Sequence, residues 1–159
     1  MKRLFLVFVL IAFVAVGTAF ADFGIGVHGG GGMSGGGGGV NFAFTNVFIY
    51  IDYMSGGYTF GFSGAVDFIQ FVNAPIIPNL NWYIRLGIGA AFWDIYRWNA
   101  SNDFGLAASV RAPIGLSWKP IPLLEVFVQV YPQIGLQILP GFNLWSSFFG
   151  GNLGVRLWF

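Results

Sequence analysis

Three residues in the first third of the chain have the types that acyl-transfer chemistry uses. His28 is the only histidine, and Ser34 and Asp52 follow it as candidates for a nucleophile and an acid. A Ser-His-acid triad works through fixed geometry, in which each member is hydrogen-bonded to the next. Ser34 lies inside the glycine tract GGGGMSGGGGG (29–39), which gives a nucleophile little preorganisation. We therefore interpret His28 as a polar residue with structural partners, and we predict no catalytic residue.

The glycine tract is similar to a phosphate-binding loop in composition only. It lacks the lysine and the Ser/Thr of a P-loop, and the strand–helix setting of a dinucleotide fingerprint. We predict a flexible loop that joins two strands. The chain has no cysteine and one histidine, so no cluster of metal ligands is visible, and we expect neither a metal nor a cofactor.

A second group of candidates consists of charges on the small-residue face of alternating segments. Its members are Asp67, Arg85, Arg111, Glu125 and Arg156. Such charges form either a selectivity constriction in a narrow pore or an ion-pair network that fills a closed interior. In both cases a buried charge requires a partner.

The elements that carry these residues are predicted to be strands with two unlike faces. The clearest is LEVFVQVYPQIGLQI (124–138), where apolar residues alternate with polar and small ones, as a period of two requires. We expect bulges at Pro113 and Pro132, which fall inside predicted strands. The predicted strands are 22–28, 37–44, 47–54, 58–72, 80–93, 104–118, 123–138 and 148–159.

The composition indicates what surrounds these strands. Only 8% of the residues are charged, against roughly 25% in ordinary soluble domains. Aromatic residues make up 19%, and the mean hydropathy is +0.72. Charges and prolines interrupt every candidate for a spanning helix after residue 21. Lipid admits only helices and closed barrels, because every backbone group must be paired, so the pattern favours a barrel whose apolar face is outside.

The first 21 residues have the anatomy of a secretory signal peptide. Lys2 and Arg3 precede the apolar run LFLVFVLIAFVAV, and small residues lead to a cleavage position after Ala21. We expect an exported barrel over 22–159. That segment has five basic and six acidic residues, a net charge of −1, with no basic patch for nucleic acid.

The end of the chain, LGVRLWF (153–159), resembles the C-terminal signal of bacterial outer-membrane barrels. Apolar residues alternate and end in an aromatic: Leu153, Val155, Leu157 and Phe159. More loosely, the segment 22–159 resembles the small eight-stranded outer-membrane proteins of the OmpA and OmpX type. The resemblance implies an all-β, eight-stranded, antiparallel up-and-down transmembrane β-barrel, inserted in outer-membrane lipid by the barrel-assembly machinery, whose last strand closes against the first.

We expect such a barrel to have a lumen largely plugged by ion pairs, because eight strands leave little room for a pore. Its role would be envelope structure, surface interaction through its loops, or at most leakage of very small solutes. Two further hypotheses remain open. Some barrels of this class modify lipids, and His28 would be the catalytic residue of that alternative. The other is a periplasmic, lipocalin-like barrel with an apolar ligand.

Several details of the barrel can be predicted. The turns TN, NAPIIPN and KPIP should be short and periplasmic. Trp82, Trp118 and Phe159 should face outward at the periplasmic rim. The other rim should carry Tyr53, Tyr58, Trp93 and Phe149.

A hairpin centred on Ile76 would pair Asp67 with Arg85, and the last hairpin would pair Glu125 with Arg156. Arg111 is then left to backbone carbonyls, Tyr131 or water.

Overall fold

The computed structural model describes residues 22–32, 35–56, 59–96, 102–139 and 141–159. The predicted signal peptide at 1–21 lies outside these ranges. Within them, no helix is long and apolar enough to span a membrane. The described strands are β1 (Phe23–Gly32), β2 (Gly35–Phe44), β3 (Val47–Gly56), β4 (Thr59–Ile77), β5 (Leu80–Tyr96), β6 (Asn102–Arg111), β7 (Ile114–Ile121), β8 (Leu124–Leu139) and β9 (Asn143–Trp158).

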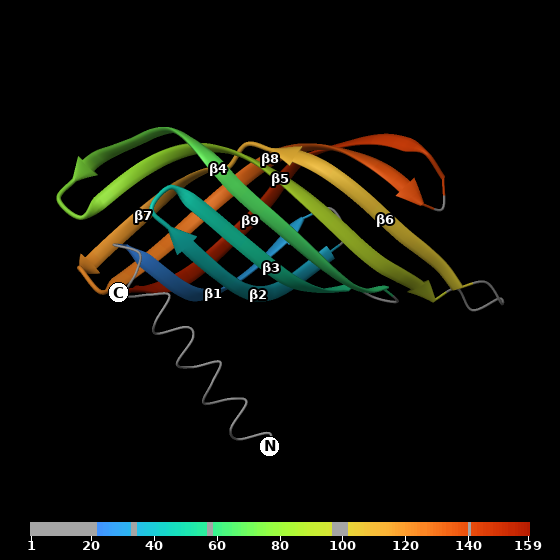
Figure 1. Cartoon of the computed structure of the whole chain (residues 1–159), viewed down its shortest axis with the longest axis horizontal. Helices are drawn as coiled ribbons and strands as arrows, with labels where there is room; N and C mark the ends of the chain where they lie inside the picture. Colours follow the sequence, from blue (N-terminus) through green and yellow to red (C-terminus); the bar gives the residue numbers. More distant parts are fainter. Residues whose placement is uncertain (1–21, 33–34, 57–58, 97–101, 140) are drawn as a thin grey trace, which may run out of the picture.

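The strands form one closed antiparallel ring (Figure 1). Each strand from β1 to β5 pairs with the next along the chain, and β9 closes the ring on β1. Both β6 and β7 pair with β5 on one side and with β8 on the other, so together they fill one position. The ring therefore has eight strand positions, and the predicted up-and-down antiparallel barrel is confirmed.

Two prolines interrupt the ladder where the sequence predicted bulges. The predicted strand 104–118 breaks at Ala112 and Pro113 into β6 and β7, because proline has no N–H to donate. The ladder bridges the break through Ala112 N, which donates to the carbonyl of Pro132 (3.0 Å), and Arg85 N, which donates to that of Pro113 (2.8 Å). A register shift between Tyr131 and Gln133 marks the bulge at Pro132.

The described parts of the glycine tract, 29–32 and 35–39, are strand, contrary to the prediction of a loop. β1 and β2 continue through it, pairing Gly29 with Gly38 and Gly32 with Gly35. Backbone hydrogen bonds need no side chain, and the same part of β1 also pairs with β9. Ser34 lies outside the described residues.

The first and last described residues and three tight turns all lie at the same end of the ring, here called the terminal end. The turns lie at 45–46, 78–79 and 122–123. Thr45 N donates to Asp22 O (3.2 Å), and Trp158 N donates to Leu123 O (2.8 Å). The prediction of short turns at this end is confirmed. The heptapeptide NAPIIPN is nevertheless mostly strand, because β4 runs to Ile77 and only Pro78 and Asn79 form the turn.

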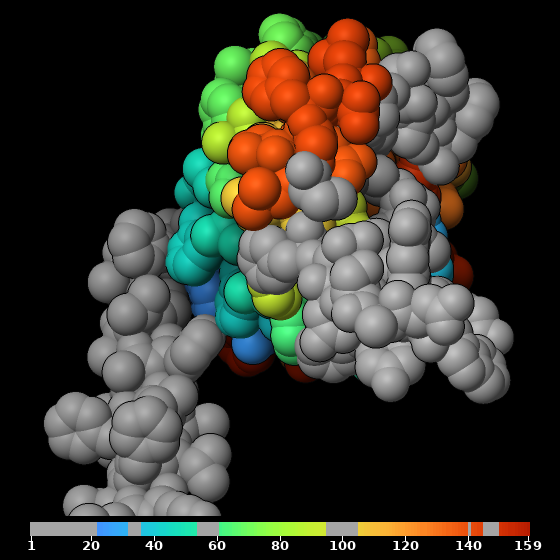
Figure 2. Space-filling view, turned by 90° about the vertical axis from the view of Figure 1, so that its right-hand side faces the viewer, coloured from blue at the N-terminus to red at the C-terminus, as the bar shows by residue number. Residues whose placement is uncertain are grey.

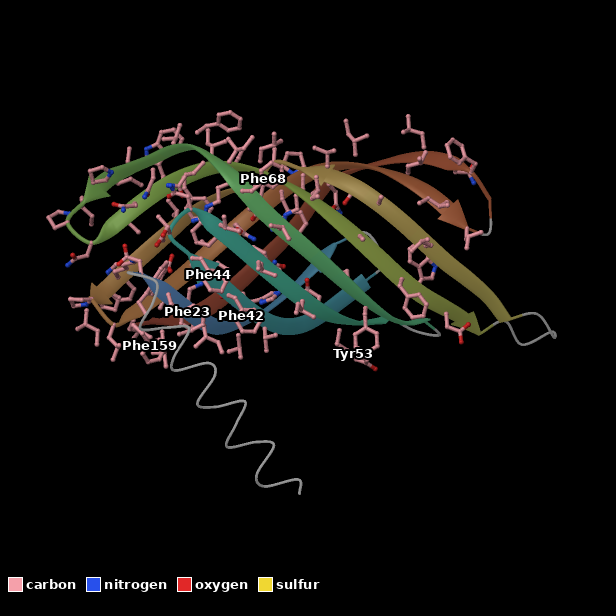
Figure 3. The ribbon with its side chains drawn as sticks, in the orientation of Figure 1. Phe23, Phe42, Phe44, Tyr53, Phe68 and Phe159 are labelled. Carbon is pink, nitrogen blue, oxygen red and sulfur yellow. The ribbon has the colours of Figure 1, made fainter. Side chains whose placement is uncertain are left out.

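The outer face of the ring is apolar. Val27, Ile134 and Leu153 are 62%, 61% and 60% exposed. In Figure 3, Phe68 lies on the outer surface, whereas Phe23, Phe44 and Phe159 gather at the terminal end. Figure 2 shows the opposite end, where described residues near the end of β8 and the start of β9 (orange) form part of the upper surface.

The inside of the ring is packed with aromatic and small side chains. The buried apolar cluster consists of Ala43, Phe48, Tyr50, Ala65 and Phe127, with Trp158 against it. The buried members of the cluster alternate along their strands with more exposed residues, as the strand period requires.

Candidate functional site in the barrel lumen

The five predicted charges all point into the barrel. The exposed fractions of Asp67, Arg85, Arg111, Glu125 and Arg156 run from 0% to 4%. The alternation of the strands places them there, because each lies on the face opposite the exposed aliphatic residues. The structure brings them together in different combinations from those the sequence suggested.

Glu125 is the centre of the first cluster. Glu125 on β8 lies directly opposite Arg156 on β9, and Arg156 Nη1 donates to Glu125 Oε2 (2.8 Å). The predicted contact between these two residues is thus present. Trp158 Nε1 donates to the same oxygen (2.6 Å), and Ser117 Oγ donates to Oε1 (2.6 Å). Both carboxylate oxygens are therefore satisfied, one of them by a guanidinium group.

A chain of polar contacts continues from Arg156 across β2 and β1 to β3. Arg156 Nε donates to Asn41 Oδ1 (2.8 Å), and Asn41 Nδ2 donates to His28 Nδ1 (3.3 Å). His28 Nε2 in turn contacts Asp52 Oδ1. Arginine can only donate, so it fixes the orientation of the Asn41 amide and thereby makes His28 accept at Nδ1 and donate at Nε2.

Asp67 forms the second ion pair, and its partner is Arg111. Arg111 Nε and Nη2 donate to the two carboxylate oxygens at 2.8 and 3.0 Å, a bidentate pair. Gly87 lies between them in the ladder, opposite Asp67 on one side and Arg111 on the other. A Cβ at Gly87 would overlap the Asp67 carboxylate, so glycine is what allows the pair to span three strands. The prediction that Arg111 lacks a carboxylate is wrong.

Among the lumen arginines that the structure describes, Arg85 is the one without a carboxylate partner, which overturns the predicted Asp67–Arg85 pair. Arg85 lies opposite Gln70, and its Nε donates to Gln70 Oε1 (3.3 Å). Its guanidinium carbon lies over the rings of Phe48 (3.3 Å) and Tyr83 (3.8 Å).

The error in this prediction was one of register. The hairpin turns at Pro78 and Asn79 instead of around Ile76. Register shifts then follow between Pro75 and Ile77 and at two further places in β4. Asp67 consequently faces Gly87, two residues beyond Arg85.

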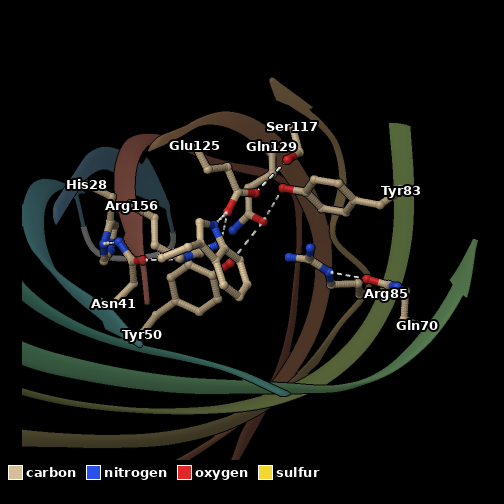
Figure 4. Close-up of polar contacts among 11 residues, drawn as sticks. His28, Asn41, Tyr50, Gln70, Tyr83, Arg85, Ser117, Glu125, Gln129 and Arg156 are labelled. Carbon is tan, nitrogen blue, oxygen red and sulfur yellow. Dashed lines mark hydrogen bonds and ion pairs between the residues drawn. The ribbon is translucent and has the colours of Figure 1, made fainter. Parts of the chain in front are cut away.

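Uncharged side chains complete the network, and sequence reasoning singled none of them out. Tyr83 and Tyr50 both donate to Gln129 Oε1, at 3.0 and 3.4 Å. Strands β3, β5 and β8 thus meet inside the barrel through one amide (Figure 4). Asn41 has a comparable role between Arg156 and His28. The alternation of the sequence does place each of these residues on the inward face of its strand, but alternation alone does not show which inward residues contact one another.

The geometry at His28 bears on the catalytic hypothesis. The side chain is completely buried between Asn41 and Asp52, with Tyr50 edge-on at 5.4 Å. Both ring nitrogens are engaged. Among the described residues, no group of three His, Cys, Asp or Glu is arranged to hold a metal ion.

The predicted rim residues face outward. Trp82, Trp118 and Phe159 are 37%, 49% and 65% exposed. Trp118 lies opposite Leu80, two residues from Trp82 on β5.

The opposite rim differs from the prediction. Trp93 is 8% exposed, because it follows outward Phe92 by one residue and therefore points inside, over Gly105. Tyr53 does face outward. Tyr58 and the side chain of Phe149 lie outside the described part of the chain.

The C-terminal segment forms the seam of the barrel. Leu153, Val155, Leu157 and Phe159 all face outward. The pairing with β1 extends to the last residue, since Phe159 N donates to Phe23 O (2.8 Å) and Phe23 N donates to Phe159 O (3.3 Å).

No protein-family model matches the sequence, and a search of curated proteins finds no match. Similarity to solved structures is clear. The N-terminal β-barrel domain of Pseudomonas aeruginosa OprF aligns with 88% of this chain and 98% of that domain, with a TM-score of 0.59 and 16% identity. Neisserial surface protein A (TM-score 0.45, 12% identity) and a major outer membrane protein from Thermus thermophilus (0.44, 12%) also align, over 87% of this chain and 96% and 100% of theirs. The chain has the fold of a small bacterial outer-membrane β-barrel.

Proposed function

We propose that the chain is an integral outer-membrane barrel with a structural or surface-interaction role and a lumen plugged by its own side chains. The observation that carries the proposal is the inversion of the two faces. Aliphatic residues such as Val27 are mostly exposed, whereas Asp67 and Arg156 inside are 0% and 1% exposed. Such an exterior suits a lipid bilayer, because in water a wide apolar surface would be exposed to solvent.

The plug is supported by contacts that cross the lumen. Tyr50 on β3 reaches Gln129 on β8, which lies on the opposite side of the ring. Arg111 on β6 reaches Asp67 on β4 past the intervening β5. Charges that line a conducting pore stay hydrated and apart, whereas these are paired and buried. An eight-stranded ring has an interior that side chains can fill.

We further propose that the barrel has no enzymatic activity. The environment of His28 supports this, because Asn41 and Asp52 engage both ring nitrogens and the side chain is inaccessible to a substrate. The partners that the proposal requires are outer-membrane lipid and the barrel-assembly machinery, which would read the segment from Leu153 to Phe159. A surface partner would bind at the end opposite the terminal end.

Planar-bilayer recording of the refolded protein tests the plug. We expect no resolvable single-channel current for the wild type. The double variant Asp67→Ala/Arg111→Ala removes the pair that spans β4 to β6 and should admit small ions. The matched control Asp94→Ala removes an exposed charge and should remain silent. Steady ion conductance of the wild type would replace the plug with the alternative, a narrow channel for very small solutes.

A further inference from the structure

The unpartnered buried polar atoms of the lumen are all hydrogen-bond donors in the part of the chain that the structure describes. Among the buried side chains that the structure describes, the atoms without a hydrogen-bond partner are Gln129 Nε2, Asn152 Nδ2 and Arg156 Nη2. All three are N–H groups, and their residues are 1%, 6% and 1% exposed. A buried donor without an acceptor is unfavourable by about 1–3 kcal/mol. Some acceptor that the chain does not supply would relieve this.

Arg85 adds a cation to the same region. It is 4% exposed, and its hydrogen bond among the described residues uses Nε alone. The rings of Phe48 and Tyr83 attract the charge through their faces. They offer no acceptor, however, to the Nη groups that lie in the guanidinium plane.

Three of these donors are linked through shared aromatic contacts. Arg85 and Arg156 both lie over the ring of Phe48, with their guanidinium carbons 3.3 and 5.0 Å from its centroid. Tyr83 stacks with Arg85 and donates its hydroxyl to Gln129. Figure 4 shows the side chains of Arg85, Arg156 and Gln129 approaching from three strands toward the middle of the lumen.

The local charge favours an anion. Arg156 shares its charge with Glu125, and both oxygens of Asp67 are engaged by Arg111. Asp52 is paired with His28. Asp52 also lies four residues from Phe48 on β3, about 13 Å at the usual strand rise. Among the carboxylates that the structure describes, none is therefore left to compensate the charge of Arg85 at this level of the barrel.

We propose that Arg85, Arg156 and Gln129 form a binding site for one small monovalent anion of the halide class. Arg85 supplies its Nη groups, Arg156 supplies Nη2 and Gln129 supplies Nε2. One negative charge matches the one excess positive charge, and a halide accepts hydrogen bonds from several directions. The site goes beyond the proposed plug, because it assigns a ligand and does not depend on whether the barrel conducts.

Bromide is the probe. The full barrel is refolded in sodium bromide, so that the ion can enter before the lumen closes, and crystals are measured at the bromine absorption edge. We expect an anomalous peak within hydrogen-bond distance of Arg85 and Gln129. The peak should disappear in Arg85→Met and persist in Lys119→Met, which removes a cation that lies over Trp158 near a turn. A wild-type map without a peak there, or a peak retained in Arg85→Met, would overturn the site.

A solution measurement gives an independent reading. The midpoint of heat unfolding, followed by the gel mobility of the barrel, should rise with bromide concentration at fixed ionic strength. The rise should be smaller in Arg85→Met and unchanged in Lys119→Met. Equal slopes for wild type and Arg85→Met would contradict the proposal. If Arg85→Met does not refold, Gln129→Leu takes its place in both experiments.

Discussion

The pairing of Asp67 with Arg111 makes a sharp prediction about stability. In Arg111→Met the methionine fills part of the space of the arginine stem, but the carboxylate of Asp67, 0% exposed, loses both of its hydrogen bonds. Breaking a buried pair from one side destabilises by about 3–5 kcal/mol, because a charge is left buried without compensation. We expect Arg111→Met to lower the free energy of unfolding by this amount.

Arg85→Met is the matched control. Each variant removes one buried arginine from the lumen, but Arg85 leaves no carboxylate behind. What it loses is one hydrogen bond to Gln70 and its stacking on two rings, each about 1 kcal/mol. Together these losses amount to about 3 kcal/mol. Removing an uncompensated buried cation, whose desolvation costs several kcal/mol, offsets most of them, so we expect a change within about 1 kcal/mol.

Urea unfolding in detergent micelles, followed by tryptophan fluorescence, measures both variants. At slopes of about 1–3 kcal/mol per molar urea, the loss in Arg111→Met shifts the midpoint by roughly 1–3 M or more. The double variant Asp67→Leu/Arg111→Met should recover most of the loss, since apolar residues of similar size replace a buried ion pair well. If Arg85→Met is as destabilising as Arg111→Met, or if Asp67 and Arg111 show no coupling in the double-mutant cycle, the assigned pairing is incorrect.

Three further outcomes are expected. Gly87→Ala should destabilise the barrel in the wild type and also in an Asp67→Ala background, measured by the same urea titration, because the added methyl group would overlap the Val66 carbonyl oxygen as well as the Asp67 carboxylate. Depth-dependent quenching should place Trp82 and Trp118 near the bilayer surface, and a midplane position for either would contradict the topology. Deleting Phe159 should reduce the fraction of heat-modifiable, membrane-inserted protein in cells, since the residue closes the seam with Phe23; wild-type insertion would show that the C-terminal resemblance is accidental.

The alternation of the sequence predicted which way side chains point. Arg85, Arg111 and Glu125 all lie inside, and Ile134 and Leu153 outside, because a strand fixes its two faces with a period of two. This information is local. The direction of a side chain is therefore predicted correctly even when the ends of its strand are wrong by several residues, and the break at Pro113 did not change it.

The glycine tract shows where local information is insufficient. Its composition favours a flexible linker, since nothing in a run of glycines has strand propensity. Its neighbours decide the outcome instead: β1 pairs with β2 on one side and β9 on the other, and the backbone pairs in the ring regardless of side chain. Closure of the barrel, a property of the whole chain, extends these strands.

Register is the property that the sequence left undetermined, and the ion pairs depend on it. Moving the turn from Ile76 to Pro78–Asn79 and adding the register shifts of β4 displaces Asp67 by two residues relative to β5. Because side chains alternate, a shift of two keeps every charge inside and still exchanges its partner. A register error of two residues therefore does not change which side chains are predicted to lie inside, but it does change which of them are predicted to form ion pairs. Gly87 is an inward glycine on the strand between Asp67 and Arg111, and its missing side chain leaves the space through which Arg111 reaches Asp67. Arg85 instead stacks on the rings of Tyr83 and Phe48. Small inward residues therefore indicate where charges on non-adjacent strands can meet, but only once the register of those strands is known.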